Sequence, residues 1–568
     1  MAQPKPPSKS SAKPSAPDPR PAGPVDDVLN QSGPFEDRDL FSQDLPLAEA
    51  IRVFGADWGR DHLARTGRLT GSARVQALAR QANRHPPELL THDRFGNRLD
   101  IVDYHPAYHE LMGLILGSET HSFGWTHDRP GAQVIRAGLS YLWNQAENGV
   151  CCPTSMTFAA IPALRQDDTL LAEWGPLVTS SRYDPRPIPP KGKQGLTVGM
   201  AMTEKQGGSD LRATMTVARP EGGRRGPGAP YILDGHKWFF SAPMSDLILT
   251  VAQTETGLSC FLATGWLPDG RRNGLRLQRL KDKCGNRANA SSEVELAGLH
   301  AVMLGEEGHG IRTILGMAQA TRFDIASASA GLMRQALTQA LHHTANRRAF
   351  QRRLSDLPVM QAVLADLAVE SEAMMWMAMR LAAALDRSGR QTDEALFFRI
   401  ATPVAKYWSC KRAPAFVAEA LECHGGNGYV ADHLMERLYR EAPLNGIWEG
   451  SGNVICLDVL RSMERTPETV DAYLSEIASA RGVNAAFDAF AGGLPDLVRQ
   501  ALAEPSLARR LVERMALALQ GSLLLRHSSP AVAQAFCATR LGGDWGQAFG
   551  TLPPGLDCGA ILERARIA

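Results

Sequence analysis

The chain has 568 residues, too many for one ordinary core, and this length predicts three to four domains of roughly 150 residues each. Hydrophobic residues make up 44% of the chain and charged residues 21%, which is typical of a globular protein that folds in water. Lys and Arg number 61 against 60 Asp and Glu, so the overall charge favours neither a nucleic acid nor a membrane as partner. No apolar run approaches the roughly 18 residues of a membrane span, and we expect no membrane association.

The nine cysteines form no Cys-x-x-Cys pair, and only Cys151 and Cys152 are adjacent. In a chain of this length, scattered cysteines indicate reduced thiols in a cytoplasmic protein rather than a disulfide framework. We expect no structural metal site.

The first 24 residues contain eight prolines together with Lys5, Lys9, Lys13 and Arg20. They contain no apolar core of the kind found in secretory signals. A segment so poor in apolar residues cannot offset its ordering entropy. We therefore expect residues 1–25 to be a disordered, basic, Pro-rich tail, either without function or acting as a weak electrostatic arm.

Residues 26–195 alternate helical patches with loops rich in Pro and Gly, which predicts an N-terminal helical domain. Within it, residues 131–148 carry apolar side chains at helical spacing, namely Val134, Ile135, Leu139, Leu142 and Trp143. Residues 179–195 are rich in proline and basic residues and indicate a linker.

The pattern changes to short strands and turns over residues 196–305, which predicts a β-barrel domain. Leu247 to Val251 and Ser292 to Leu296 are strand-like runs, and Asp234-Gly235 and Pro268-Asp269-Gly270 are turn signals. Short runs separated by turns are typical of a small barrel or sandwich.

Helical periodicity returns over residues 306–464, which predicts a second helical domain. One apolar ladder predicts a long helix that ends near Ser388-Gly389, and its members are Met360, Val363, Leu364, Leu367, Met374, Met375, Ala378, Leu381 and Leu385. The next helix is expected to end at Gly425-Gly426. Residues 465–568, punctuated by prolines such as Pro495, Pro505 and Pro530, predict an extra C-terminal helical domain. The fold class is therefore α+β with several domains.

Four motifs combine glycines, hydroxyls and aromatic residues in the way that a cofactor site needs. They are Met202 to Asp210, His236 to Ser241, Cys423 to Tyr429 and Ile447 to Asn453. Glycine and hydroxyl residues in a loop let backbone N–H groups approach an anion or a flat ring closely. Among Trp238, Phe239 and Phe240, at least one ring must point away from the barrel core, where it can wall a planar cofactor. Each motif alone is explained about as well by a plain turn or by core packing.

The last motif sets a carboxylate beside the start of a helix. The turn Gly450-Ser451-Gly452-Asn453 precedes a helix over residues 454–463 and leaves N–H donors free at the positive end of its dipole. Glu449 lies beside Trp448 just before that turn, where partial desolvation would make the carboxylate a better base. A tie to Arg440 or to a backbone amide is the alternative.

Together the motifs resemble the acyl-CoA dehydrogenase family across residues 190–465. The family's Thr-Glu-x-x-x-Gly-Ser-Asp loop, its Gly-x-Lys-x-aromatic-x-Thr/Ser strand, its Arg-x-x-Phe, its Gly-Gly-x-Gly-Tyr and its aromatic-Glu-Gly-Thr/Ser match residues 203–210, 235–241, 347–350, 425–429 and 448–451. A closer resemblance is to the AidB branch of that family, whose members are flavoproteins of the bacterial adaptive response to DNA alkylation. Residues 279–283, 285–290 and the region past 465 look like that branch.

The resemblance implies FAD bound non-covalently between the β domain and the second helical domain. The implied contacts with the flavin ring, the pyrophosphate and the phosphate-closing turn are Met202, Thr203, Gly208, Ser209, Phe239, Ser241, Gly450, Ser451 and Asn453. Arg347 and Phe350 would reach FAD bound by a neighbouring subunit. The adenosine end would be lined by Gly425, Gly426 and Gly428. These contacts imply a homotetramer, built as a dimer of dimers.

The same resemblance places Glu449 where many members carry the catalytic base. That base takes an α-proton from an acyl thioester while a β-hydride passes to the flavin. The chain departs from the family at Phe239 for Trp, at Ser241-Ala242 for Thr-Asn and at Gln351 for Gly. FAD binding is expected to survive these changes, whereas they put ordinary acyl-CoA recognition in question. Surface ion pairs are expected for three further cations, Arg322, Arg437 and Arg440.

The AidB-like resemblance also implies binding of double-stranded DNA through the extra C-terminal domain. Residues 465–568 contain ten Arg, no Lys and ten acidic residues, which is a weak electrostatic footprint. Five arginines fall close together, namely Arg499, Arg509, Arg510, Arg514 and Arg526. Arg510 and Arg514 are spaced to share a helix face, which favours a phosphate-binding stripe. A solvated face paired with Glu504 and Glu513 is the alternative.

Three functions are therefore in competition. The first is an AidB-like protein that binds FAD and DNA and protects against alkylating agents, directly or by destroying them, with weak acyl-CoA dehydrogenase activity. The second is a metabolic dehydrogenase of short or branched acyl-CoA without DNA binding. The third is a scaffold that keeps FAD as a structural element. We expect a cytoplasmic bacterial flavoprotein.

Overall fold

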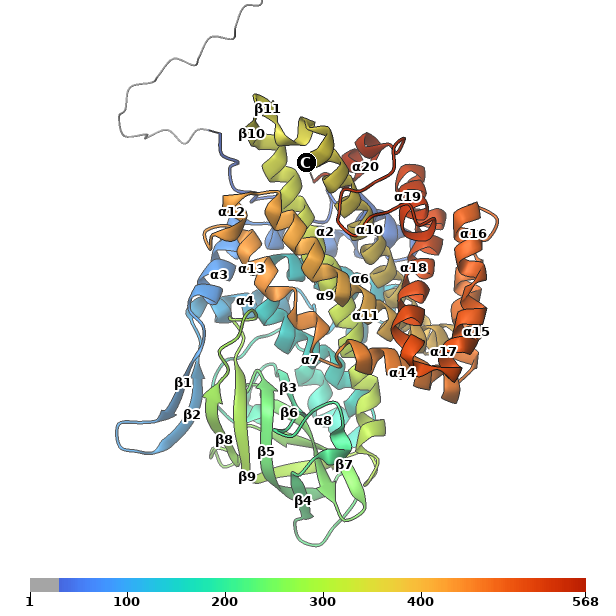
Figure 1. Cartoon of the computed structure of the whole chain (residues 1–568). Helices are drawn as coiled ribbons and strands as arrows, with labels where there is room; N and C mark the ends of the chain where they lie inside the picture. Colours follow the sequence, from blue (N-terminus) through green and yellow to red (C-terminus); the bar gives the residue numbers. More distant parts are fainter. Residues whose placement is uncertain (1–29, 568) are drawn as a thin grey trace, which may run out of the picture.

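The computed structural model describes residues 30–567. The tail expected over residues 1–25 lies outside the described residues. Three layers stand out in Figure 1, with the β-sheet at one end, long central helices above it and C-terminal helices packed along one side.

The N-terminal region is mostly helical. Its helices are α1 (Leu45–Val53), α2 (Arg60–Thr70), α3 (Ala73–Arg84), α4 (Pro106–Gly117), α5 (Phe123–Thr126), α6 (Ala132–Ala146), α7 (Asn148–Leu164) and α8 (Asp168–Val178). The helix predicted over residues 131–148 is confirmed as α6, and every one of its residues is buried. This happens because α6 packs against α2, α9 and α10 at once, so even its polar side chains face other helices.

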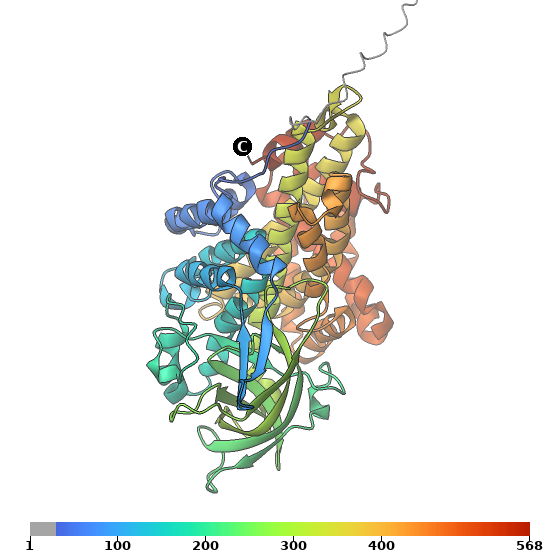
Figure 2. The same cartoon turned by 90° about the vertical axis from the view of Figure 1, so that its left-hand side faces the viewer.

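A β-hairpin interrupts this region and was not expected from the sequence. Strands β1 (Glu88–His92) and β2 (Arg98–Asp103) pair antiparallel and project from the body beside the sheet (Figures 1 and 2). The Asp93 carboxylate closes the turn by accepting hydrogen bonds from the backbone N–H groups of Phe95 and Asn97.

The central region is a seven-stranded sheet closed into a barrel. Its strands are β3 (Val198–Ala201), β4 (Val217–Pro220), β5 (Pro230–Ser241), β6 (Leu247–Thr254), β7 (Gly257–Thr264), β8 (Leu275–Leu280) and β9 (Ser291–Leu304). The order is β3-β5-β4-β6-β7-β9-β8, and a further antiparallel pairing of β5 with β9 closes the ring. Tyr231, Phe240 and Phe261 fill its interior and are fully buried.

The turn predicted at Asp234-Gly235 is wrong, because both residues lie inside β5. The pairing of β5 with β9 shifts register between Leu233 and Asp234, so the glycine marks a bulge in a continuous strand. A side chain at position 235 would collide with Thr216 on the neighbouring chain segment. Bulges and turns use the same residue types, which explains the error. The turn at Pro268-Asp269-Gly270 is confirmed between β7 and β8.

Three long helices form the centre of the molecule. They are α9 (Gly310–Asn346), α10 (Pro358–Arg387) and α11 (Thr392–Glu422), followed by α12 (Gly426–Tyr429), α13 (Leu434–Glu441) and α14 (Gly452–Arg465). The predicted end of the long helix near Ser388 is confirmed. A short hairpin with strands of two residues each, β10 (Arg348–Ala349) and β11 (Arg352–Arg353), joins α9 to α10.

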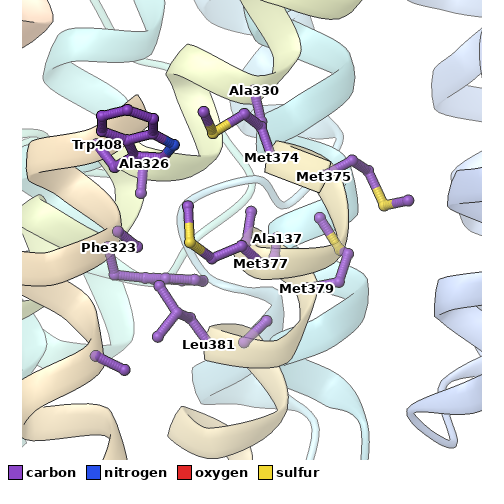
Figure 3. Close-up of a cluster of buried hydrophobic side chains, with 14 of the residues drawn as sticks. Ala137, Phe323, Ala326, Ala330, Met374, Met375, Met377, Met379, Leu381 and Trp408 are labelled. Atoms are coloured by element: carbon purple, nitrogen blue, oxygen red, sulfur yellow. The ribbon is translucent and has the colours of Figure 1, made fainter. Parts of the chain in front are cut away.

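The core between these helices is built from sulfur and aromatic side chains. Met374, Met377 and Leu381 of α10 meet Phe323 of α9 and Trp408 of α11, as Figure 3 shows. Methionine fills irregular gaps between helices well, because its chain is unbranched and its sulfur is polarisable.

The last helices are α15 (Glu468–Ala478), α16 (Ala485–Gly492), α17 (Leu494–Ala503), α18 (Ala508–His527), α19 (Pro530–Phe536) and α20 (Cys558–Ala565). Helix α18 packs on α10, α11 and α14, and α20 packs on α10 and α1. The helices past residue 465 therefore share one core with the rest of the chain. The predicted fold class, helices around a central barrel with further C-terminal helices, is confirmed, while the domain limits drawn at residues 195, 305 and 464 stay predictions.

Candidate functional site

The loop of residues 203–210 is held against strand β5 by a buried ion pair. The Lys237 ammonium lies 2.8 Å from Oε1 of Glu204, and both side chains are buried. Glu204 also accepts hydrogen bonds from the Thr216 hydroxyl and from the backbone N–H of Met215. Burial raises the pKa of Glu204, but these partners outweigh it and hold the pKa at about 2. The motif glutamate thus fixes the loop rather than facing a ligand.

Strand β5 presents Phe239 away from the barrel, beside that loop. Its ring is 53% exposed, whereas Phe240 next to it is fully buried in the barrel. The backbone N–H of Trp238 donates to the carbonyl of Thr203, and Ser241 pairs with Met200 at the end of β3. The structure therefore brings Met202, Thr203, Phe239 and Ser241 together as a small wall. Gly208 lies against the Thr203 side chain, and Ser209 is exposed on the same loop.

The turn that carries Glu449 is held through its backbone. Arg322 of α9 donates through Nε to the carbonyl of Glu449, and Lys406 of α11 donates to the carbonyl of Gly450. Glu449 has a φ of 56° and Gly450 a φ of 108°, a left-handed turn that directs the chain into α14. Within residues 30–567 the half-buried Glu449 carboxylate makes no hydrogen bond or ion pair, so it is free to act on a ligand.

The alternative partner for Glu449 is otherwise engaged. Arg440 pairs with Glu436, one turn earlier on α13. Arg322 pairs with Asp458 of α14 at 2.8 Å and is itself part-buried. The expectation of a surface ion pair is wrong for Arg437, which is only 6% exposed and donates to the carbonyl of Ala146. Desolvation lowers the pKa of this buried guanidinium.

Helix α14 begins at Gly452, two residues before the predicted start, so Gly452 and Asn453 belong to the helix rather than to the turn. Ser451 occupies the N-cap position without a side-chain hydrogen bond to the helix, and Asn453 is exposed in the first turn. The first N–H groups of this helix are therefore not capped by the Ser451 side chain, as an anion site requires.

The remaining predicted cofactor residues lie far from this wall in the same chain. At about 1.5 Å per residue, the stretch of α9 from Arg322 to Arg347 spans roughly 40 Å. Arg347 donates to the backbone carbonyl of Asn30, and Phe350 is 88% exposed at the tip of the β10–β11 hairpin, at the end of the molecule opposite the sheet in Figure 1. Gly425 is the N-cap of α12, and Gly426 and Gly428 lie within that helix. The neighbouring His424 ring is 4.7 Å from that of His343 on α9. The fourteen predicted cofactor residues thus form two separate groups.

A polar cluster that the motifs did not reveal adjoins the wall. The Cys152 thiol of α7 lies against the side chains of Ser241 and Asn289, within electrostatic reach of Lys283 and Glu449. Burial raises the pKa of this thiol to about 12. Lys283 and Asn289 belong to the two AidB-like stretches, but nothing in their local sequence links them to residue 152.

The five arginines proposed for DNA differ in how free they are. Arg499 pairs with Asp496, Arg509 donates to the Tyr407 hydroxyl at 3.0 Å, and Arg526 pairs with Glu476. The Arg514 guanidinium stacks 3.8 Å from the centre of the Phe490 ring. Arg510 has no hydrogen bond or ion pair within the described chain, and with Arg514 it lines a concavity of about 460 Å³ between α17 and α18. The predicted shared face of Arg510 and Arg514 therefore exists.

Two classes of site find no support within residues 30–567. No group of three or more His, Cys, Asp or Glu side chains there is arranged to hold a metal ion. None of the helices in that range combines the length and the apolar character needed to cross a membrane.

Family comparisons agree with this geometry. Residues 30–185 match the N-terminal domain of the adaptive response protein AidB, residues 199–299 the acyl-CoA dehydrogenase middle domain, and residues 308–464 the acyl-CoA dehydrogenase C-terminal domain. The chain is 44% identical to AidB of Escherichia coli (strain K12) over 517 residues, which is 90% of this chain and 94% of that protein. The chain belongs to the acyl-CoA dehydrogenase family, in its AidB branch.

Two further relatives extend the comparison. Acyl-CoA dehydrogenase family member 11 of Caenorhabditis elegans is 30% identical over 88% of this chain and 81% of that protein. The crystal structure of ACDH-11 from Caenorhabditis elegans, in complex with C11-CoA, superimposes with a TM-score of 0.82 at 27% identity, over 90% of this chain and 93% of that chain. The structure of Bd2924 in its apo form superimposes with a TM-score of 0.80 at 27% identity, over 88% of this chain and 100% of that chain.

Proposed function

We propose that this chain is an FAD-dependent oxidoreductase that acts on a CH–CH bond beside an acyl thioester, with Glu449 as the base. The observation that carries the proposal is the free Glu449 carboxylate, set on a turn that Arg322 and Lys406 hold by its backbone. A base held in this way keeps its position while its side chain stays available to a substrate. The C11-CoA bound to ACDH-11 supports a thioester as substrate class.

The residues present suit FAD. A flat ring needs an aromatic edge and a polar edge, which Phe239 and Ser241 supply on β5. A pyrophosphate needs unpaired N–H donors, which the start of α14 at Ser451 supplies. The indole N–H of Trp448 is buried and has no hydrogen-bond partner among residues 30–567, so one polar atom beside Glu449 is left for a ligand.

Bound FAD supplies the acceptor for a hydride from the β-carbon of the substrate. The Glu449 carboxylate takes the proton from the α-carbon, and its oxygen then holds that proton. Phe239 and Trp448 shield the reacting carbons from water. Lys406 and Arg322 keep the turn in place, so that proton transfer needs no movement of the backbone.

The activity is tested by mixing the FAD-loaded protein with a series of acyl-CoA thioesters in the absence of oxygen. Bleaching of the oxidised-flavin band by any member of the series supports a dehydrogenase. Retention of FAD without bleaching by any thioester would favour a role in which the flavin is structural.

We also infer that a second copy of the chain completes the cofactor site, within a homotetramer built as a dimer of dimers. The two groups of predicted FAD contacts are too far apart in one chain for one cofactor to touch both. The hairpin that carries Phe350 is under backbone strain, because Phe350 and Gln351 both have positive φ values, 51° and 65°. An exposed aromatic on a strained turn is expected where a neighbour's ligand is bound.

Replacing both Arg347 and Phe350 with alanine should weaken FAD binding by about 10- to 100-fold, the effect of losing a hydrogen bond to a charged group. The flavin content per chain after gel filtration measures the effect, and light scattering reports the assembly. Arg390→Ala, an exposed change in the loop between α10 and α11, is the matched control. FAD binding as tight as in the wild type would refute the shared site.

We further propose that the protein serves the bacterial response to DNA alkylation and binds double-stranded DNA, as the AidB branch implies. Arg510 and Arg514 support this role, since they line one concavity and Arg510 has no partner in the described chain. All nine cysteines are free thiols, which suits the bacterial cytoplasm. Whether alkylating agents are destroyed or DNA is only shielded, the same surface would hold the duplex.

Reversing both charges, with Arg510→Glu and Arg514→Glu, should weaken binding to a non-specific duplex and lower its salt dependence by roughly one phosphate contact per residue. A gel-shift titration at low and moderate salt measures both. Arg481→Glu is the control, because Arg481 is exposed in the same region. Removing everything past residue 461 is a poor test, because α18 belongs to the shared core. Unchanged, salt-sensitive retention in the variant would place the duplex on another surface, whereas no binding by the wild type at low salt would favour a metabolic dehydrogenase.

A further inference from the structure

Residues 30–35 lie as a strap across the C-terminal end of α9, beside the β10–β11 hairpin. His342 of that helix donates through Nε2 to the carbonyl of Gly33 at 2.8 Å. Nδ1 of the next residue, His343, lies 3.0 Å from the Ser32 hydroxyl, within hydrogen-bonding distance. The strap is thus fixed to α9 at two successive positions, and its first residue reaches the hairpin.

Asn30 binds the first strand of that hairpin much as another strand would. Its side-chain amide donates to the carbonyl of Arg348 at 2.9 Å, and its Oδ1 accepts from the backbone N–H of Arg348 at 2.7 Å. The backbone carbonyl of Asn30 also accepts a hydrogen bond from the Arg347 guanidinium. Asn30 has a φ of 56°, a left-handed conformation that asparagine adopts more readily than most residues. One residue thus holds both the backbone of β10 and a guanidinium proposed to reach a neighbour's FAD.

The hairpin has few contacts of its own to fix its shape. Its strands pair through two residues each, and Arg348 lies directly opposite Arg353, so like charges face each other across the ladder. Phe350 and Gln351 at its turn both have positive φ values, which cost free energy. A strained hairpin of this kind keeps one conformation only when surrounding contacts fix it. The hydrogen bonds to Asn30 are such contacts, at the base of the turn.

The strap also reaches the glycine residues proposed to line the adenosine end of the cofactor. Asn427 of α12 donates through its side-chain amide to Oε1 of Gln31 at 2.9 Å. Gly425, Gly426 and Gly428 flank Asn427 at the start of that helix and within it. Two adjacent strap residues therefore join the hairpin to α12, the two parts of one group of predicted FAD contacts.

We propose that Asn30 and Gln31 position this group of residues for the FAD bound by a second copy of the chain. The inference rests on the proposed shared cofactor site. Asn30 and Gln31 are positioning residues, because they hold the groups that meet the cofactor and do not touch it themselves. With the strap in place, Arg347 and Phe350 are already ordered when the cofactor arrives, and prior ordering of this kind tightens binding.

Asn30→Gly in the full-length protein tests the strap, because glycine accepts the left-handed backbone and only the side-chain hydrogen bonds are lost. We expect FAD binding to weaken by about 5- to 30-fold, measured as the Kd from the rise in flavin fluorescence on dilution. Asn30→Asp keeps the acceptor for the backbone N–H of Arg348 and should recover part of the loss. Asp37→Gly is the matched control, because Asp37 also has a φ of 56° but bonds the backbone N–H of Ala73 instead. It should leave FAD binding unchanged.

A second comparison separates positioning from a general effect on the fold. In protein that already carries Arg347→Ala and Phe350→Ala, Asn30→Gly should change FAD binding by no more than about twofold, because the side chains through which Asn30 acts are gone. Gln31→Ala, which breaks the bond to Asn427, is the second variant should Asn30→Gly fail to fold. It should weaken FAD binding in the otherwise native chain.

The inference and the shared cofactor site fail in different ways. Binding of FAD as tight in Asn30→Gly and Gln31→Ala as in the wild type, with weaker binding in the Arg347→Ala, Phe350→Ala protein, would overturn the role of the strap and leave the shared site standing. An equal loss from Asn30→Gly in both backgrounds would also overturn that role, because the strap would then act on the fold and not through the hairpin. Unchanged FAD binding in the Arg347→Ala, Phe350→Ala protein would refute the shared site and the inference with it.

Discussion

Glu449→Gln should lower the rate of flavin reduction by a thioester by about 10²- to 10⁴-fold, the usual contribution of a general base. The amide has the shape of the carboxylate but cannot take the α-proton. FAD binding should be unchanged, since the Glu449 side chain makes no hydrogen bond or ion pair within residues 30–567 and its turn is held through backbone carbonyls. Anaerobic stopped-flow absorbance measures the rate.

Glu464→Gln is the matched control for this variant, because Glu464 is exposed on the same helix that follows the turn. It should reduce flavin as fast as the wild type. An undiminished rate in Glu449→Gln would remove Glu449 from the chemistry and leave the base unidentified.

Breaking the buried pair between Glu204 and Lys237 should destabilise the protein by about 3–5 kcal/mol, because either single change leaves an unpaired charge in the interior. Lys237→Met leaves the buried Glu204 carboxylate without its cationic partner. Glu204→Gln leaves the buried Lys237 ammonium without an anionic partner, and its other hydrogen-bond partner is the carbonyl of Val251. The double variant should cost less than the sum of the two, since it removes both charges. Urea unfolding at neutral pH measures all three.

Lys205→Met, an exposed change beside Glu204, is the control and should alter the free energy of unfolding by less than about 0.5 kcal/mol. Single variants as stable as this control would show that the loop of residues 203–210 is held to β5 by other contacts.

Periodic patterns predicted the fold well. The apolar residues from Met360 to Leu385 lie in α10, which packs against both α9 and α11, and this packing explains their regular spacing. The helix ends at Arg387 with Ser388 as its C-cap, as predicted. The barrel strands at Leu247 and Ser292 are also confirmed; the first six residues of β6 are all buried, so a short continuous apolar run gives its signal. The β1–β2 hairpin escaped notice because it projects from the body and only part of each strand is buried.

The candidate site was predictable only in part. The exposed ring of Phe239 follows from three aromatics in a row, and the start of α14 follows from its Gly-Ser-Gly turn. The convergence of Cys152, Asn289 and Glu441 does not follow from local sequence, because these residues come from α7, a barrel loop and α13 and meet only through tertiary packing. Burial of Arg437 is likewise a tertiary effect.

The most direct test of the dehydrogenase account is anaerobic titration of the purified, FAD-loaded protein with an acyl-CoA thioester, in the wild type and in Glu449→Gln side by side. The account predicts bleaching of the flavin band in the wild type and an intact, oxidised band in the variant. Equal bleaching in both proteins, or no bleaching of the wild type by any thioester in the series, would contradict it.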